Sequence, residues 1–217
     1  MKIIGLVGSP RAGGNTDLLV GAALEGARES GAKVEKILVK NLQIDTCEGC
    51  LACWQSGFCD RFDDDLPWLV EQLSEADGLV LGSPVWSGFL PGSMKNVFDR
   101  LTGPATIIEA TRVLSRLPQK RRNGLSIAVC ATPALQMAEA AVIFLNYNLQ
   151  LHANGGEVNE IRATGLMARG QVGLDVSGLT EMYKQMGLAD AVKMAVGADK
   201  GNRDLLARAR EAGSKLV

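Results

Sequence analysis

The sequence lacks the features of a membrane protein, a nucleic-acid-binding protein or a hydrolase with a side-chain triad. Its longest apolar runs fall short of the roughly 18 to 20 residues that a bilayer-spanning helix needs. The apolar start at residues 1–8 is followed by Ser-Pro-Arg rather than by a cleavage site, so we expect a first strand and a cytoplasmic protein. The 23 basic and 24 acidic residues nearly cancel, which gives no electrostatic reason to expect nucleic acid or an anionic membrane as a partner.

Short apolar runs alternate with longer amphipathic stretches along the 217 residues, and no internal repeat interrupts them. This pattern predicts an α/β fold, a doubly wound five-stranded parallel sheet with helices on both faces. We expect a single domain over residues 1–217, with a cysteine-rich loop at 45–62 and a C-terminal helical extension from about 165 to 217. The expected strands are 2–7, 33–39, 78–82, 126–131 and 157–163, and the expected helices are 15–30, 64–75, 92–101, 135–149 and 202–215.

The loop at residues 8–16 combines glycines and hydroxyl groups and leads directly into a helix. Backbone N–H groups at a helix N-terminus form an anion site. Arg11 adds positive charge, and Ser9, Asn15 and Thr16 can donate hydrogen bonds to phosphate oxygens. The spacing matches neither a dinucleotide nor a triphosphate loop, so we expect one monophosphate. The alternative is a glycine-rich turn followed by a helix that Asn15 or Thr16 caps.

The loop after the third strand is held open by prolines and glycines and carries two aromatic residues, Trp86 and Phe89. Aromatic side chains beside a phosphate site favour a planar ligand. Backbone amides near Ser87 and Gly88 are in a position to bond the heteroatoms of such a ring. The alternative is that both aromatic residues pack under the loop or onto a partner subunit.

Four of the five cysteines fall within 13 residues, as Cys47-x2-Cys50-x2-Cys53-x5-Cys59. Thiolates are soft ligands that suit zinc or iron–sulfur clusters, and the compact spacing favours a cubane cluster over zinc. Cys130 stands apart in an apolar run and is expected to be a buried small hydrophobic residue.

Two motifs together resemble the NADPH-dependent FMN reductase family over roughly residues 1–131. They are Ser-Pro-Arg-x-Gly-Gly-Asn-Thr after the first strand, and Gly-Ser-Pro-Val-Trp with Lys-x-x-x-Asp-Arg after the third. The resemblance implies a flavodoxin-like fold, FMN as cofactor and NAD(P)H as transient substrate. Trp86 replaces the tyrosine that is usual in the family, and residues 131–137 replace a glycine-rich third loop. The implied FMN contacts are Ser9, Arg11, Asn15, Thr16, Asp17 and Leu18 in the first loop and helix, and Pro84, Val85, Trp86, Ser87 and Gly88 in the second loop.

The cysteine segment resembles that of the iron–sulfur flavoproteins, a branch of the same family that binds a [4Fe–4S] cluster. The resemblance implies Cys47, Cys50, Cys53 and Cys59 as the ligands. Other flavin reductases with a similar segment bind no cluster, and their cysteines are free thiols, packing groups or a redox pair. Both interpretations stay open at this point.

We therefore expect an FMN-dependent oxidoreductase that moves electrons between NAD(P)H or a reduced carrier and an acceptor, with a ferredoxin-like partner if a cluster is present. A cluster-free NAD(P)H:FMN or quinone reductase and a non-catalytic flavodoxin-type carrier are the alternatives. The resemblance also implies a homodimer or homotetramer. We interpret residues 119–122 as a solvated basic patch or an oligomer contact, Asp63, Asp64 and Asp65 as helix-start charges, and His152 as a helix-end residue.

Overall fold

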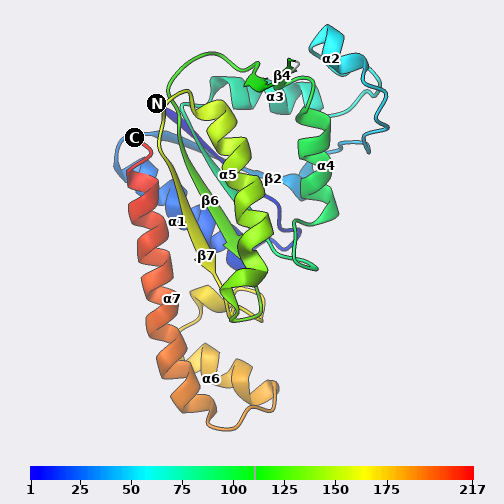
Figure 1. Ribbon diagram of the computed structural model, residues 1–217. Helices are drawn as coiled ribbons and strands as arrows, with labels where there is room; N and C mark the ends of the chain where they lie inside the picture. Colours follow the sequence, from blue (N-terminus) through cyan, green and yellow to red (C-terminus); the bar gives the residue numbers. More distant parts are fainter. Residues whose placement is uncertain (110) are drawn as a thin grey trace.

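The computed structural model describes residues 1–109 and 111–217 and places a parallel sheet between two layers of helices (Figure 1). The five strands of this sheet have the order β2-β1-β3-β6-β7, and all four neighbouring pairs are parallel. This strand order is that of the flavodoxin-like doubly wound fold. The predicted fold class is confirmed.

The elements follow one another along the chain with few long connections. The strands are β1 Lys2–Val7, β2 Lys33–Leu38, β3 Gly78–Pro84, β4 Thr106–Ile108, β5 Val113–Ser115, β6 Asn123–Val129 and β7 Val158–Ala163. The α-helices are α1 Asn15–Glu29, α2 Ala52–Ser56, α3 Leu66–Glu75, α4 Gly92–Leu101, α5 Glu139–Ala153, α6 Val176–Gln185 and α7 Ala191–Ser214. Three short 3-10 turns are η1 Val39–Asn41, η2 Leu135–Ala138 and η3 Gln171–Gly173.

The strands bury side chains on both faces because successive residues of a strand point to opposite sides. On β1, Ile4 and Leu6 join a core beneath α3, α4 and α5. Ile3 and Val7 join a second core beneath α1 and α7. In Figure 1 these two groups of helices lie on opposite sides of the sheet. Burial on both faces explains why the strands read as continuous apolar runs.

The loops that follow β1 and β3 meet at the carboxyl edge of the sheet. These two strands are neighbours, and the amide of Gly8, just after β1, donates to the carbonyl oxygen of Gly82 over 2.8 Å. Met94 on α4 packs against Gly8, where a side-chain Cβ would approach it to 2.9 Å. Both loops are therefore supported on one rigid platform.

The connection between α4 and β6 differs from the expected loop. It contains an antiparallel hairpin of two three-residue strands, β4 and β5. Three-residue strands are too short for a recognisable alternation, so the hairpin is not evident from the sequence.

Arg122 contradicts the interpretation of residues 119–122 as a solvated patch, since only 2% of it is exposed. Its guanidinium donates to the carbonyl oxygens of Ala76 at 2.9 Å and Pro118 at 2.7 Å. Burial lowers the pKa of Arg122 from its ordinary value. These carbonyl acceptors make burial of the side chain tolerable.

The aspartates at 63–65 also have more specific roles than helix-start charges. The helix begins at Leu66, two residues later than expected, and Asp65 is its N-cap. Asp64 accepts the Leu66 amide at 3.0 Å and forms an ion pair with Arg100. Asp63 is exposed.

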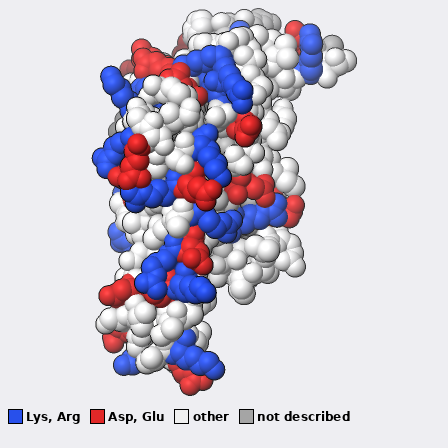
Figure 2. Space-filling view, turned by 90° about the vertical axis from the view of Figure 1, so that its left-hand side faces the viewer, with Lys and Arg blue, Asp and Glu red and all other residues white. Residues whose placement is uncertain are grey.

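The C-terminal part is two helices, of which α7 is longer than expected. The end of α7 packs against α1 and contributes Ala209 to the core, followed by Leu216. α6 and the start of α7 share a small core of their own with Leu179 and Tyr183. Figure 2, viewed from the α7 side, shows Lys and Arg interspersed with Asp and Glu, so neither sign of charge dominates this face. Among the described residues, no helix has both the length and the apolar character needed to cross a membrane.

Candidate functional site

The first loop ends in a helix start with uncapped amides. Gly14 is the N-cap of α1 and has no side chain with which to cap it. A Cβ at this position would lie 2.9 Å from the Arg11 carbonyl oxygen, so the tight turn requires glycine. The amide of Gly13 is held by the Asp17 carboxylate at 2.7 Å. The positive end of the helix dipole is thus presented at the loop, together with the buried hydroxyl-bearing residues Ser9 and Thr16.

The second loop is a two-residue hairpin turn. The amides and carbonyls of Trp86 and Phe89 bond each other at 2.8 and 3.0 Å, and Ser87 and Gly88 between them have φ of 50° and 80°. Both central residues have positive φ, as in a type I′ turn. The turn leaves Trp86 46% exposed. An apolar indole is therefore displayed beside the first loop.

The two loops line one pocket of about 200 Å³, together with residues that follow β6 and β7. Asp17, Leu18, Ser87 and Gly88 are outside its lining, and so is the third loop after Ala131. The lining residues are Ser9, Arg11, Gly14, Asn15, Thr16, Pro84, Val85, Trp86, Val129, Ala131, Leu166, Met167, Ala168 and Arg169. The structure therefore brings together seven of the eleven predicted cofactor contacts.

The Asn15 side chain forms hydrogen bonds within the protein, whereas it was expected to donate a hydrogen bond to a phosphate. Its Nδ2 donates to the carbonyl oxygens of Leu166 and Ala168 at 3.4 and 2.8 Å. Its Oδ1 accepts the amide of Val172 at 3.0 Å. With both ends of the amide occupied, Asn15 positions the segment after β7 instead.

The segment after β7 supplies pocket residues that the sequence analysis missed. Arg169 donates to the carbonyl oxygen of Ala12 in the first loop, so two guanidinium groups, Arg11 and Arg169, border the pocket. The available signal was positional: β7 ends at the same carboxyl edge as β1 and β3, and an arginine follows it within a few residues.

A second cavity, of about 290 Å³, is lined by all four clustered cysteines. Cys47 and Cys50 are exposed, and Cys53 and Cys59 are partly buried. Cys53 fits closely against Gly103, where a Cβ would lie 2.3 Å from its sulfur. Burial raises the pKa of the Cys53 thiol, and neighbouring Cys59 raises it further. Within residues 1–109 and 111–217, no group of three or more His, Cys, Asp or Glu is arranged to hold a metal ion.

Helix α4 fixes the cysteine segment through two side chains one turn apart. Asn96 donates to the carbonyl oxygens of Ile44 and Asp45 at 3.0 and 3.1 Å and accepts the Cys47 amide at 3.1 Å. Arg100 donates to the carbonyl oxygen of Asp45 at 2.7 Å. Arg100 belongs to the Lys-x-x-x-Asp-Arg motif, but the sequence analysis gave neither residue a role. The i, i+4 spacing on one helix face was the available signal.

Arg100 and Asp64 form a buried ion pair beside this cavity. Their side chains are 1% and 3% exposed, and Nη1 lies 2.7 Å from Oδ2. Burial by itself would raise the pKa of Asp64. The hydrogen bonds that its carboxylate accepts from Arg100, Leu66 and Asp45 have the larger combined effect, so the pKa of Asp64 is lowered from its ordinary value. Burial opposes the charge of Arg100, but Asp64 and then Cys59 raise its pKa above the ordinary value.

The Nε of Arg100 is buried without a hydrogen-bond partner in the described chain. A buried donor of this kind is costly unless it finds an acceptor. Arg100 lines the cysteine cavity, and thiolate or sulfide sulfur is an acceptor of the required charge. Four thiols and one unpaired buried donor therefore line this cavity, although the described thiols are not arranged around a metal ion.

The remaining cysteine and the histidine lie outside both cavities. Cys130 is buried, as predicted. His152 occupies the last turn of α5, also as predicted.

A model of the family described as NADPH-dependent FMN reductase matches residues 1–147. The chain belongs to this family. An iron–sulfur flavoprotein of Methanosarcina thermophila is 40% identical over 100 residues, 46% of this chain and 52% of that protein. An NAD(P)H-dependent FAD/FMN reductase of Geobacillus thermodenitrificans is 31% identical over 107 residues, 48% and 54% of the two chains. The chain spans about half the length of the curated relatives it matches.

Two solved structures share the fold of this family member at low sequence identity. An azoreductase from Bacillus anthracis superposes with a TM-score of 0.65 at 15% identity over 99% of both chains. An NAD(P)H:quinone oxidoreductase from Methanothermobacter marburgensis superposes with a TM-score of 0.62 at 16% identity, over 100% of this chain and 99% of that one. The family resemblance predicted from the two loops is confirmed by the family match.

Proposed function

We propose that this chain is an FMN-dependent oxidoreductase that passes electrons from NAD(P)H, or from a reduced carrier, to an acceptor. The observation that carries the proposal is the pocket shared by the two loops. It combines an uncapped helix start, two arginines and an exposed aromatic turn, which suits a ligand with one phosphate and one planar ring. Membership of the FMN reductase family supports the same ligand.

In this proposal the protein binds and orients the flavin. The amides at the start of α1, with Ser9, Thr16 and Arg11, hold the phosphate, and Pro84–Gly88 borders the ring. Bound FMN would supply the two-electron and one-electron chemistry. In this proposal Asn15 does not bind the phosphate itself. It holds the segment that carries Arg169 in place.

The test is FMN titration of the purified chain, followed by steady-state NADH and NADPH oxidation with a quinone or free flavin as acceptor. We expect one FMN per chain and turnover with a nicotinamide. An Arg11→Ala variant should bind FMN roughly 10- to 150-fold more weakly, since a charge-assisted hydrogen bond contributes roughly 1.5 to 3 kcal/mol. Arg208→Ala, an exposed arginine on α7, is the matched control and should bind normally.

The outcomes separate the alternatives. FMN binding with negligible turnover would favour a flavodoxin-type electron carrier reduced by a protein partner. Failure to bind FMN would refute the central proposal.

We further propose that Cys47, Cys50, Cys53 and Cys59 hold a [4Fe–4S] cluster, and that a ferredoxin-like protein exchanges electrons with it. The shared cavity and the unpaired Arg100 Nε support this, as does the name of the Methanosarcina thermophila relative. Four thiolates are the usual ligand set of such a cluster.

Iron and sulfide assays on protein purified without oxygen test the cluster proposal. We expect about four irons per chain, reduced by Cys50→Ser and unchanged by Cys130→Ala, which alters the one cysteine outside the cavity. Absence of iron after anaerobic reconstitution would overturn this proposal in favour of a cluster-free reductase, with FMN binding unaffected.

We also propose a homodimer or homotetramer that is cytoplasmic. Large apolar side chains are exposed at the second loop, at η2 and along α5; they include Trp86, Met137, Ile143 and Tyr147. Such groups are typical of protein interfaces. Light scattering on the FMN-loaded protein tests the assembly, and a monomer at micromolar concentration would contradict it.

A further inference from the structure

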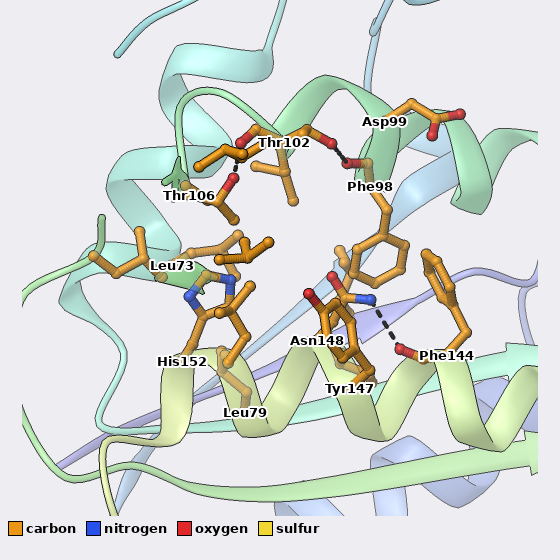
Figure 3. A pocket seen from close by; sticks show the side chains of 18 residues that line it. Leu73, Leu79, Phe98, Asp99, Thr102, Thr106, Phe144, Tyr147, Asn148 and His152 are labelled. Atoms are coloured by element: carbon orange, nitrogen blue, oxygen red, sulfur yellow. Dashed lines mark hydrogen bonds between the residues drawn. The ribbon is translucent and has the colours of Figure 1, made fainter. Parts of the chain in front are cut away.

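A third cavity, of about 200 Å³, lies between α4, α5 and the β4–β5 hairpin, and none of the predicted cofactor or metal contacts lines it (Figure 3). Its walls are largely apolar and include Leu79 and Leu81 from the sheet, Phe98 from α4, and Phe144 and Leu151 from α5. An engineered apolar cavity of about 150 Å³ stays dry and binds benzene. This cavity is of comparable volume and has largely apolar walls, so it has room for one aromatic ring.

Most polar side chains in the wall donate hydrogen bonds to backbone carbonyl oxygens of the protein. Thr102 donates to the carbonyl oxygen of Phe98 at 3.2 Å, Thr106 donates to that of Thr102, and Asn148 donates to that of Phe144 at 2.8 Å. These bonds are drawn in Figure 3. The wall therefore offers few free donors to a ligand.

His152 and the half-exposed Tyr147 do not share this pattern. The Nδ1 of His152 lies 2.7 Å from the hydroxyl of Ser115, and that hydroxyl already accepts the amide proton of Leu117 at 3.2 Å. In the tautomer in which the Ser115 hydroxyl donates to Nδ1, the imidazole proton is on Nε2. Figure 3 shows one ring nitrogen of His152 turned toward the cavity. Burial, and then the charge of Arg122, lowers the pKa of His152 to about 4, so the ring is neutral at pH 7.

The charged groups in the wall indicate the charge of the ligand that the cavity can accept. Asp99 is the charged residue of the wall, and its carboxylate is paired with Lys95. An anion would meet this carboxylate, and either sign of charge would lose hydration without a partner in the apolar interior. A neutral ligand is therefore favoured.

We propose that this cavity is a second ligand site, separate from the FMN pocket, for a small neutral aromatic molecule with one hydrogen-bond acceptor, such as an aryl ketone. The ring lies against the leucine and phenylalanine side chains, and the acceptor oxygen receives the proton of His152 Nε2. Asp99 and Thr102 also line the cysteine cavity, so the ligand borders the cysteine segment without entering it.

The test titrates the FMN-loaded protein with acetophenone and, separately, with ethylbenzene, which has a similar shape but no acceptor. Leucine methyl NMR signals report where each compound binds. We expect saturable binding of both compounds, with shifts at Leu79 and Leu151 and no release of FMN. In a His152→Phe variant, acetophenone should bind roughly 3- to 10-fold more weakly, as expected for one lost hydrogen bond. Ethylbenzene should bind as before, and His152→Gln, which restores a donor, should recover part of the acetophenone affinity.

Three results would overturn the proposal. They are non-saturating shifts in the wild-type protein, shifts confined to the FMN pocket, and equal loss of both compounds in a correctly folded His152→Phe variant. The first two use the wild-type protein alone, so they decide the question even if a variant fails to fold.

Discussion

Replacing Asp64 with asparagine leaves the buried Arg100 guanidinium without its carboxylate partner. Both side chains are almost fully buried, and Arg100 Nη1 lies 2.7 Å from the Asp64 carboxylate. Removing one member of a buried ion pair costs about 3 to 5 kcal/mol, mainly because the other charge stays buried and uncompensated. Arg100 keeps its bond to the carbonyl oxygen of Asp45, so we expect the lower end of this range, about 3 kcal/mol.

A loss of this size is easily measured by thermal unfolding. For a chain of 217 residues, 1 kcal/mol corresponds to roughly 2 to 4 °C in Tm, so Asp64→Asn should lower Tm by about 9 °C. Asp63→Asn is the matched control, because Asp63 is the adjacent carboxylate and is exposed. It should change Tm by less than about 2 °C, as exposed substitutions usually do. Equal shifts for the two variants would refute the buried-pair reasoning.

The same pair predicts a pH dependence. The pKa of Asp64 is lowered from its ordinary value of 3.8, so the unfolded chain binds this proton more readily than the folded one. The contribution of Asp64 is therefore present at neutral pH and is lost as the pH falls below about 4. Urea unfolding of wild type and Asp64→Asn should give a constant difference from pH 7 to 5 and a shrinking one below pH 4. A difference that persists unchanged at low pH would contradict the assigned charge state.

Three further predictions concern packing, the pocket wall and the histidine. Gly213→Ala should lower the free energy of unfolding measured in urea by about 1 to 3 kcal/mol, because the added Cβ would lie 1.8 Å from the carbonyl oxygen of Ala23. The control is Gly201→Ala on the same helix, where the added Cβ would meet open space. This control should leave the stability unchanged or raise it by up to about 1 kcal/mol. Asn15→Asp turns a carboxylate toward the carbonyl oxygens of Leu166 and Ala168 and should lower both the stability and the FMN affinity measured by titration; an unchanged affinity would mean that the segment after β7 does not shape the pocket. The single imidazole NMR signal set of His152 should not titrate between pH 5 and 8, because its pKa is lowered to about 4; a midpoint near 6.5 would mean that the ring is solvated.

The sequence was sufficient for the sheet and for two of the pocket's walls. The continuous apolar runs at β1 and β3 are long enough to be recognised as buried strands, and topology then places the loops after them at one edge. The same topology brings the segment after β7 to this edge, but the position of Arg169 within that segment depends on a loop whose path is set by the distant Asn15 side chain. The sequence reasoning also assigned exposure to Arg122, since arginine is normally solvated. Only the fold brings enough carbonyl oxygens around Arg122 to bury it.

One strand–loop–helix unit, from β3 through α4, contributes to all three cavities. Its loop supplies Pro84 and Trp86 to the proposed FMN pocket, and one face of α4 holds the cysteine segment through Asn96 and Arg100. Another face of α4 lines the third cavity with Phe98. Because successive residues of a helix are rotated by about 100°, Phe98 lines only the third of these cavities and Arg100 only the cysteine cavity, with Asp99 between them lining both. A change at Arg100 should therefore alter the cysteine segment with little effect on FMN affinity, whereas a change at Met94, which packs against Gly8, should affect the first loop and leave the cysteines in place.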